Sequence, residues 1–112
     1  MSSERPVYLR LRDMIVEAIL DGRIRDGDPL PSVRGFAAEQ GANPLTVAKA
    51  YQSFQEEGLV TVRRGVGMFV VEGATDRLRD RARAQFLEQE WPRLSATIRR
   101  LRLDPAELLL TV

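Results

Sequence analysis

The segment from Asn43 to Lys49 gathers four kinds of chemical group within seven residues. It contains an amide at Asn43, an apolar side chain at Leu45, a hydroxyl at Thr46 and an ammonium at Lys49. In the major groove of DNA an amide can pair with adenine, an ammonium with guanine or phosphate, and an apolar side chain with the methyl group of thymine. These residue types suit contact with base edges, and they equally suit a solvated helix face with a normal cap.

A second set of candidate residues is the run Arg63-Arg64-Gly65-Val66-Gly67. Glycine lets the backbone approach a phosphate or a groove closely, and arginine supplies positive charge. A plain glycine turn with solvated arginines would have the same sequence. Arg34 is a third candidate, and its alternative is a surface ion pair with Glu39 or Asp13.

The chain offers little for catalysis, because it contains neither cysteine nor histidine. Thiolate chemistry is therefore absent, and zinc or another transition metal lacks its usual ligands. Acid–base work could use only carboxylates, Lys49, Tyr8 or Tyr51, and no paired carboxylates, phosphate loop or Ser/His/Asp set occurs. We expect no enzyme, no catalytic residue, no cofactor and no metal site. The two tyrosines suit core or backbone-contacting positions.

Helical spacing of apolar residues predicts helices over 6–20, 32–40 and 44–57. Ser32 and Asn43 can cap the second and third of these. Two helices that are separated by about three residues, one of them glycine, form the helix-turn-helix pattern. The third helix has a buried stripe and an outward face. The stripe is Val47, Ala50, Tyr51 and Phe54, and the outward face is Leu45, Thr46, Lys49, Gln52 and Ser53.

A β-hairpin follows the three helices. Residues 59–63 and 68–71 are rich in β-branched or aromatic side chains and flank the turn at 64–67. The predicted fold is therefore mainly α with a small β-hairpin: a winged helix-turn-helix followed by a short C-terminal helical dimerisation region.

The tail carries an apolar seam with spacings of 4, 3, 4 and 3 residues, as in a two-stranded coiled coil. Its members, the expected dimerisation residues, are Leu87, Trp91, Leu94, Ile98 and Leu101. Pro92 should kink this helix or split it in two. Asp104 and Pro105 look like the cap and first residue of a last helix. Trp91 could line a small-molecule effector site, although a tryptophan in a core fits the same pattern.

We expect two domains, a DNA-binding domain at 1–74 and a dimerisation tail at 75–112. The 112 residues have a net charge of +1, so composition does not indicate a nucleic acid or membrane partner. The first 75 residues hold nine basic and ten acidic side chains, a net charge of −1. Binding of DNA would need the few cations to converge on one face, and two copies of the chain to hold an operator.

The first residues do not lead into an apolar stretch, which argues against a secretory signal. No apolar run approaches the roughly 20 residues of a membrane helix. The lack of cysteine fits a reducing compartment. We therefore expect a cytoplasmic protein without a membrane partner.

Several motifs in order resemble the GntR family of bacterial regulators over about 65 residues. The most specific are Leu30-Pro31-Ser32-Val33-Arg34 and Asn43-Pro44-Leu45-Thr46-Val47, the latter continuing to Lys49-Ala50-Tyr51. The short tail resembles the YtrA-type subfamily, which has a small two-helix dimerisation region. By motif position, the residues matching the DNA-contacting positions of the family are Arg34, Asn43, Pro44, Thr46, Lys49, Arg64, Gly65 and Gly67. Leu45 departs from the family, where Asn or Ser is usual.

The resemblance implies a homodimer that binds a double-stranded operator with inverted-repeat symmetry, represses transcription and controls an ABC-transporter operon. It leaves room for an effector of unknown identity. An alternative function is a winged-helix module for protein–protein contact without direct DNA binding. The exposed Leu45 and the net charge of the DNA-binding domain at 1–74, called the head below, favour that alternative. A salt titration on DNA would separate the two.

Overall fold

The computed structural model describes residues 5–111 of the chain, which forms two compact units that divide between Leu78 and Arg79. The expected boundary at 74/75 lies one helical turn earlier. Ala74 and Leu78 are buried in the core of the first unit, so the first turn of the tail helix packs with the head. Among the described residues, no helix has the length and apolar character that a membrane crossing requires.

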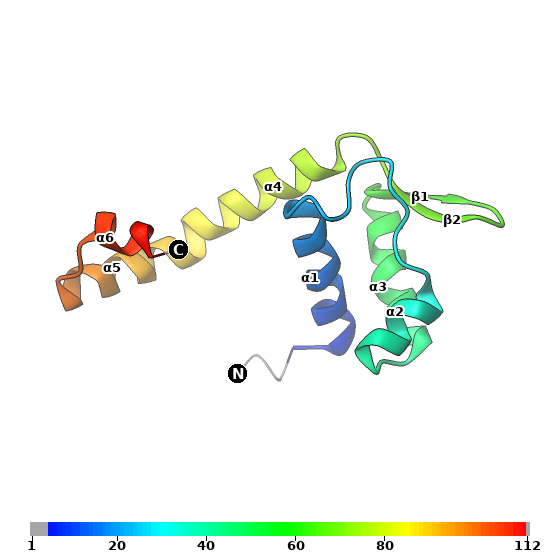
Figure 1. Ribbon diagram of the computed structural model, residues 1–112, viewed down its shortest axis with the longest axis horizontal. Coiled ribbons are helices and arrows are strands. Elements are labelled where there is room, and N and C mark those ends of the chain that lie inside the picture. The colour runs from blue at the N-terminus through cyan, green and yellow to red at the C-terminus, as the bar shows by residue number, and fades with distance from the viewer. Residues whose placement is uncertain (1–4, 112) are drawn as a thin grey trace. The chain divides into compact units, whose positions relative to one another are not determined.

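The first unit is three helices and a hairpin, followed by the start of a fourth helix (Figure 1). Its elements are α1 (Val7–Leu20), α2 (Val33–Gln40), α3 (Pro44–Glu56), β1 (Val60–Arg63), β2 (Gly67–Val70) and the beginning of α4 (Ala74–Gln85). This architecture confirms the predicted winged helix-turn-helix. The strands differ from the prediction by a residue at some ends.

Side-chain caps define where α2 and α3 begin. The Ser32 hydroxyl oxygen accepts a hydrogen bond from the Gly35 N–H at 3.0 Å, and the Asn43 Oδ1 accepts one from the Leu45 N–H at 2.8 Å. Each bond satisfies a donor that the first helical turn would leave unpaired. Gly41, at φ +62°, turns the chain between the two helices in a backbone conformation that disfavours other residues.

The hairpin is antiparallel, with Val60 opposite Val70 and Arg63 opposite Gly67. The connector between α1 and α2 runs along the outer edge of β2. Its Leu30 N–H donates to the Met68 carbonyl at 2.9 Å, and the Val70 N–H donates back to the Asp28 carbonyl at 2.9 Å. The connector therefore covers most of an edge that would otherwise be open.

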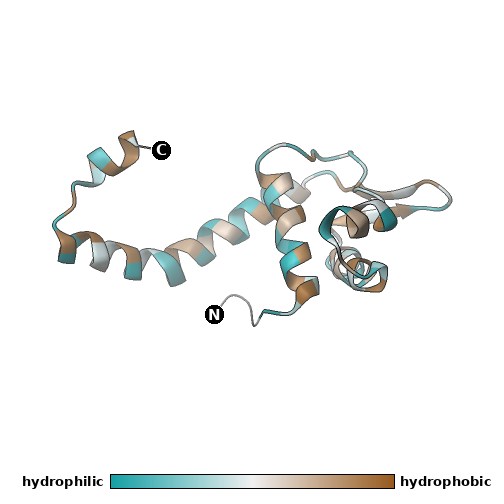
Figure 2. Ribbon diagram, turned by 60° about the horizontal axis from the view of Figure 1, so that its bottom comes forward, coloured by the Kyte–Doolittle hydropathy of each residue, from teal (hydrophilic) through white to brown (hydrophobic). Residues whose placement is uncertain are grey.

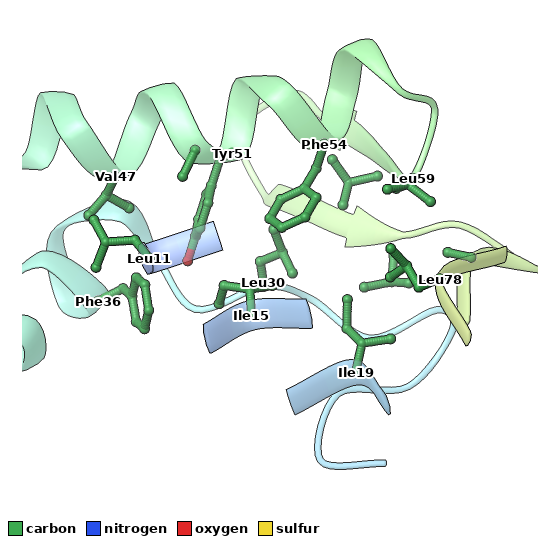
Figure 3. Packing of buried hydrophobic residues seen from close by; sticks show 14 of the residues in the cluster. Leu11, Ile15, Ile19, Leu30, Phe36, Val47, Tyr51, Phe54, Leu59 and Leu78 are labelled. Atoms are coloured by element: carbon green, nitrogen blue, oxygen red, sulfur yellow. The ribbon is translucent and has the colours of Figure 1, made fainter. Parts of the chain in front are cut away.

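The core of the first unit lies between α1, α3 and the hairpin (Figure 3). Leu11, Ile15 and Ile19 of α1 face Tyr51 and Phe54 of α3. The Tyr51 hydroxyl donates to the Pro31 carbonyl at 2.8 Å, as expected of a backbone-contacting core tyrosine. Burial, with a smaller contribution from the negative charge of Glu39, raises the pKa of this phenol above its usual range.

The second unit contains the rest of α4 and two further helices. A π-helical turn at Phe86–Glu90 joins α4 to α5 (Trp91–Leu101), and α6 (Pro105–Leu110) follows. Pro92 has no N–H to donate to the carbonyl four residues earlier, which favours an irregular turn just before it. The predicted interruption near Pro92 is thus a π-helical turn, and the chain is not split into two helices there but stays helical through it. The Asp104 Oδ1 accepts from the Ala106 N–H at 3.0 Å, so the predicted cap of the last helix forms.

A carboxylate from the α1–α2 connector caps the start of α4. Asp26 accepts hydrogen bonds from the Gly73 N–H at 2.8 Å, the Thr75 N–H at 3.1 Å and the Thr75 hydroxyl at 2.6 Å. A negative charge here also meets the positive end of the helix dipole. The half-buried Asp26 thereby ties the first turn of the tail helix to the head.

We predict that Asp26→Ala lowers the free energy of unfolding by about 2 kcal/mol, because charge-assisted caps of buried helix ends are lost. Asp21→Ala is the matched control, since its ion pair with Arg23 has side chains that are 63% and 64% exposed. Such a pair contributes at most about 0.5 kcal/mol. Urea denaturation at one protein concentration compares the two, and equal midpoints would contradict the prediction.

Candidate nucleic-acid interface

One face of α3 is buried and the other projects from the head. Val47, Ala50 and Phe54 are fully buried, whereas the Leu45 side chain is 78% exposed. Lys49 and Gln52 are exposed as predicted, but Thr46 and Ser53 are half-buried. The prediction that Ser53 faces outward is wrong in this respect. Its hydroxyl oxygen accepts from Arg12 Nη1 at 2.8 Å, and its hydroxyl donates to the Ala50 carbonyl.

Asn43 serves first as a cap. Bidentate recognition of adenine uses both the oxygen and the nitrogen of the amide. Here Oδ1 already accepts the Leu45 N–H, which leaves Nδ2 as the uncommitted donor. The cap therefore fixes the orientation of the Asn43 amide at the start of α3.

Lys49 rests on an aromatic ring from another helix. Its Nζ lies 4.2 Å from the centre of the Tyr8 ring, on α1. The ring attracts the ammonium without neutralising its charge. Sequence reasoning assigned Tyr8 to the core or the backbone and missed this contact. No spacing could have revealed it, because only the packing of α1 on α3 brings these two residues together.

Arg12 joins α1 to the end of α3. Its guanidinium contacts both carboxylate oxygens of Glu57, at 2.8 and 3.0 Å, and its central carbon lies 4.5 Å from the Phe54 ring centre. The Arg12 side chain is 14% exposed. A bidentate, partly buried pair of this kind restrains the rotation of one helix against another. Neither the type nor the spacing of Arg12 in the sequence indicates this role.

Two glycines in the turn of the hairpin adopt positive φ angles, which other residues rarely adopt. Gly65 and Gly67 have φ of +77° and +144°. Arg63 stacks on Phe69, with its guanidinium carbon 4.2 Å from the ring centre. Val66, between the glycines, is 71% exposed. The hairpin tip therefore presents arginine and an apolar side chain together.

Arg34 is exposed on the first turn of α2. The predicted alternative of an ion pair with Glu39 or Asp13 is wrong, because Asp13 pairs with Arg5 at 3.0 Å and no ion pair joins Arg34 to either acid. Pro44 takes the first position of α3, as predicted.

Charge is distributed unevenly in the head. Three runs, 29–38, 42–55 and 58–71, contain no acidic residue. They contain Arg34, Lys49, Arg63 and Arg64. They also include all of α3 except its last residue, Glu56, and both strands of the hairpin. The net charge of −1 for the head therefore does not describe the outward face of α3 or the hairpin. Among residues 5–111, no acidic cluster could hold a metal ion.

The apolar seam of the tail is largely exposed to solvent in the single chain. Leu87, Trp91, Leu94 and Leu101 are exposed, Ile98 is half-buried, and no residue of 79–111 is fully buried. Figure 2 shows apolar stretches recurring along this part of the chain up to the C-terminus. The Trp91 ring lies 6.3 Å from the Phe86 ring, in no enclosed core.

A helix-turn-helix with a hairpin and cations on its outward face is the architecture of a DNA-binding transcriptional regulator. The family described as "Bacterial regulatory proteins, gntR family" matches residues 7–70. The chain belongs to this family. Membership confirms that it is a transcriptional regulator and not an enzyme.

Two relatives come from Bacillus subtilis. The uncharacterized HTH-type transcriptional regulator YhcF is 36% identical over 88 residues, which are 77% of this chain and 73% of YhcF. The HTH-type transcriptional repressor YtrA is 40% identical over 76 residues, which are 68% of this chain and 58% of YtrA. The match thus spans less than two thirds of YtrA.

Two solved structures are similar. A transcriptional regulator from Oenococcus oeni has 28% identity and a TM-score of 0.72, covering 96% of this chain and 88% of its own. The DNA-binding domain of AraR, in complex with operator ORR3, has 26% identity and a TM-score of 0.56. That comparison covers 59% of this chain and 80% of the AraR chain. The likeness to the first extends beyond the head into the tail.

We predict that Tyr8→Leu weakens DNA binding about threefold per site, because the cation–π contact that holds Lys49 is lost. Tyr8→Phe is the control, since phenylalanine keeps the ring face. Fluorescence anisotropy on a labelled DNA duplex at several salt concentrations measures both variants. If the leucine and phenylalanine variants bind equally, Tyr8 does not position Lys49.

Proposed function

We propose that this regulator is a repressor that binds an inverted-repeat operator as a homodimer. One observation carries the proposal. The outward face of α3 and the hairpin lie in stretches of the head that contain basic residues and, up to residue 55 of α3, no acidic ones. Phosphate contacts supply much of the affinity for DNA, and they need local positive charge more than a basic protein.

The first turn of α3 is the part that would read bases. Recognition helices contact base edges mostly with their N-terminal residues. Asn43 and Thr46 offer donors and acceptors just before and within this turn, Lys49 adds a donor in the next turn, and Pro44 presets the backbone. Within residues 5–111, no ion pair joins Arg34 of α2 to an acid, and Arg34 would contact a phosphate, which positions the helix.

The hairpin would contact the backbone beside the groove. Gly65 and Gly67 let the chain approach a phosphate, and Arg64 supplies a charge at the turn. The Arg63 guanidinium lies over the Phe69 ring, which leaves its charge available to a phosphate. The operator-bound AraR domain, a structural relative, supports this use of the head.

The tail would pair two chains. In the single chain none of its seam residues is fully buried, although burial of each such side chain is worth about 1.5–3 kcal/mol. These residues are Leu87, Trp91, Leu94, Ile98 and Leu101. A second copy supplies an identical apolar surface, as two-fold dimers do. Two recognition helices would then meet half-sites about 34–36 Å apart.

Repression is supported by YtrA, a relative named a repressor. Control of an ABC-transporter operon follows from the resemblance to the YtrA-type subfamily and is part of the same proposal. A small-molecule effector could bind at the tail, where Phe86, Arg93, Leu94 and Thr97 line an open groove of about 380 Å³. The ring of Trp91 lies beside that of Phe86, with 6.3 Å between their centres.

Selection of bound duplexes from a random pool tests the proposal as a whole. We expect an inverted repeat whose half-sites are one helical turn apart. A pool that yields no enriched sequence would contradict DNA recognition and favour the protein-contact alternative. An enriched sequence without two-fold symmetry would contradict the homodimer.

We predict that Arg34→Ala weakens operator binding about tenfold and lowers the salt slope, as expected for a lost phosphate contact. Thr46→Ala should weaken binding and relax the base preference. Arg23→Ala is the control, because this exposed arginine pairs with Asp21 away from α3. The dimer should persist in all three. Wild-type affinity of both the Arg34 and Thr46 variants would refute the assigned contacts.

We predict that Leu94→Asp combined with Ile98→Asp yields monomers in light scattering, because charge cannot be buried in an apolar seam without a partner. Arg99→Asp with Arg100→Asp is the control. It adds the same two carboxylates to exposed positions of α5 outside the seam and should leave the dimer intact. If the variant with Leu94→Asp and Ile98→Asp remains a dimer, the interface lies elsewhere.

A further inference from the structure

The two most exposed apolar side chains of the head are at the two places where the proposed function puts DNA. Leu45, in the first turn of α3, is 78% exposed, and Val66, at the hairpin tip, is 71% exposed. The other exposed apolar residues of the head are far less open, at 39–48%. Exposed leucines are common, but one at this position would gain about 1.5–3 kcal/mol if a partner covered it fully.

The position of Leu45 is well defined. Its N–H is held by Asn43 Oδ1 at 2.8 Å, and Pro44 restricts the backbone just before it. Helical leucines point back toward the N-terminus of their helix. The isobutyl group therefore projects over the end of α3 that enters a major groove.

The surroundings specify the chemistry of the partner. Leu45 lies in the acid-free run 42–55, with Lys49 one helical turn further along α3. A nearby cation favours a polyanion, whereas the side chain itself can neither donate nor accept a hydrogen bond. On the major-groove edge of DNA, the only apolar group is the 5-methyl of thymine. Placed over a guanine, adenine or cytosine edge, Leu45 would cover polar atoms without pairing them.

We propose that Leu45 is a specificity-determining residue that recognises the 5-methyl group of a pyrimidine in each half-site. This rests on the proposed operator binding and adds the feature that is read. The contact depends on the methyl group and not on hydrogen bonds of the base. A 5-methylcytosine at the same position therefore substitutes in part for thymine.

The test replaces thymine by deoxyuridine, which removes the methyl group and keeps the base pair. The probe is the palindromic duplex selected by the wild-type protein, with each thymine replaced in turn, symmetrically in both half-sites. One position should lose about 15-fold in affinity, or about fourfold per half-site, as burial of one methyl group predicts. At that position 5-methylcytosine should bind more tightly than cytosine.

Leu45→Ala completes the comparison. It should bind the thymine duplex more weakly than wild type and show a thymine-to-deoxyuridine ratio close to one at that position. Val66→Ala, the other exposed apolar residue, is the matched control and should keep the wild-type ratio. Leu45 packs against no core, so both variants fold.

The outcomes separate the two proposals. If wild type binds the selected operator and no deoxyuridine substitution weakens it, methyl recognition is overturned and operator binding stands. The same holds if Leu45→Ala keeps the full deoxyuridine penalty, because another residue then reads the methyl group. If no duplex is selected at all, operator binding itself fails.

Discussion

The burial of one face of α3 is the constraint on which the rest of the head depends. Val47, Ala50 and Phe54 are excluded from solvent, and Tyr51 adds a hydrogen bond to the connector at Pro31. Rotation of α3 would expose these side chains, at about 1.5–3 kcal/mol for each large one. Because the inner face cannot move, the outer face that begins at Leu45 projects in a fixed direction. The core thus sets the geometry of the surface that we assign to DNA.

The electrostatics of the head follow a simple division. Lys49 and Arg63 lie on aromatic rings, Tyr8 and Phe69, whereas Arg12 is paired with the carboxylate of Glu57. A ring restrains a cation and leaves its charge available, whereas a carboxylate neutralises it. The cations on the outward surface are therefore oriented and still attractive to phosphate. This explains how a head of net charge −1 can belong to a family of DNA-binding regulators.

The second unit obeys a different constraint, because it has no buried residue within 79–111. Its helices form through caps at Asp104 and through backbone bonds, while the apolar seam stays uncovered in one chain. In the proposed homodimer, association of two chains would cover this seam, as packing covers the core of the head. Asp26 caps the first turn of α4, which belongs to the first unit.

Local signals in the sequence determined the elements. Caps at Ser32, Asn43 and Asp104, the apolar stripe of α3 and the interruption near Pro92 all depend on neighbours within one or two helical turns, so spacing reveals them. Most of the candidate surface was predicted for the same reason. Only the tertiary structure decided how that surface is held. The contacts of Lys49 with Tyr8, of Arg12 with Ser53 and of Asp26 with Thr75 join residues more than 40 positions apart. No periodicity encodes such pairs, because they exist only once the hydrophobic core has brought the helices together.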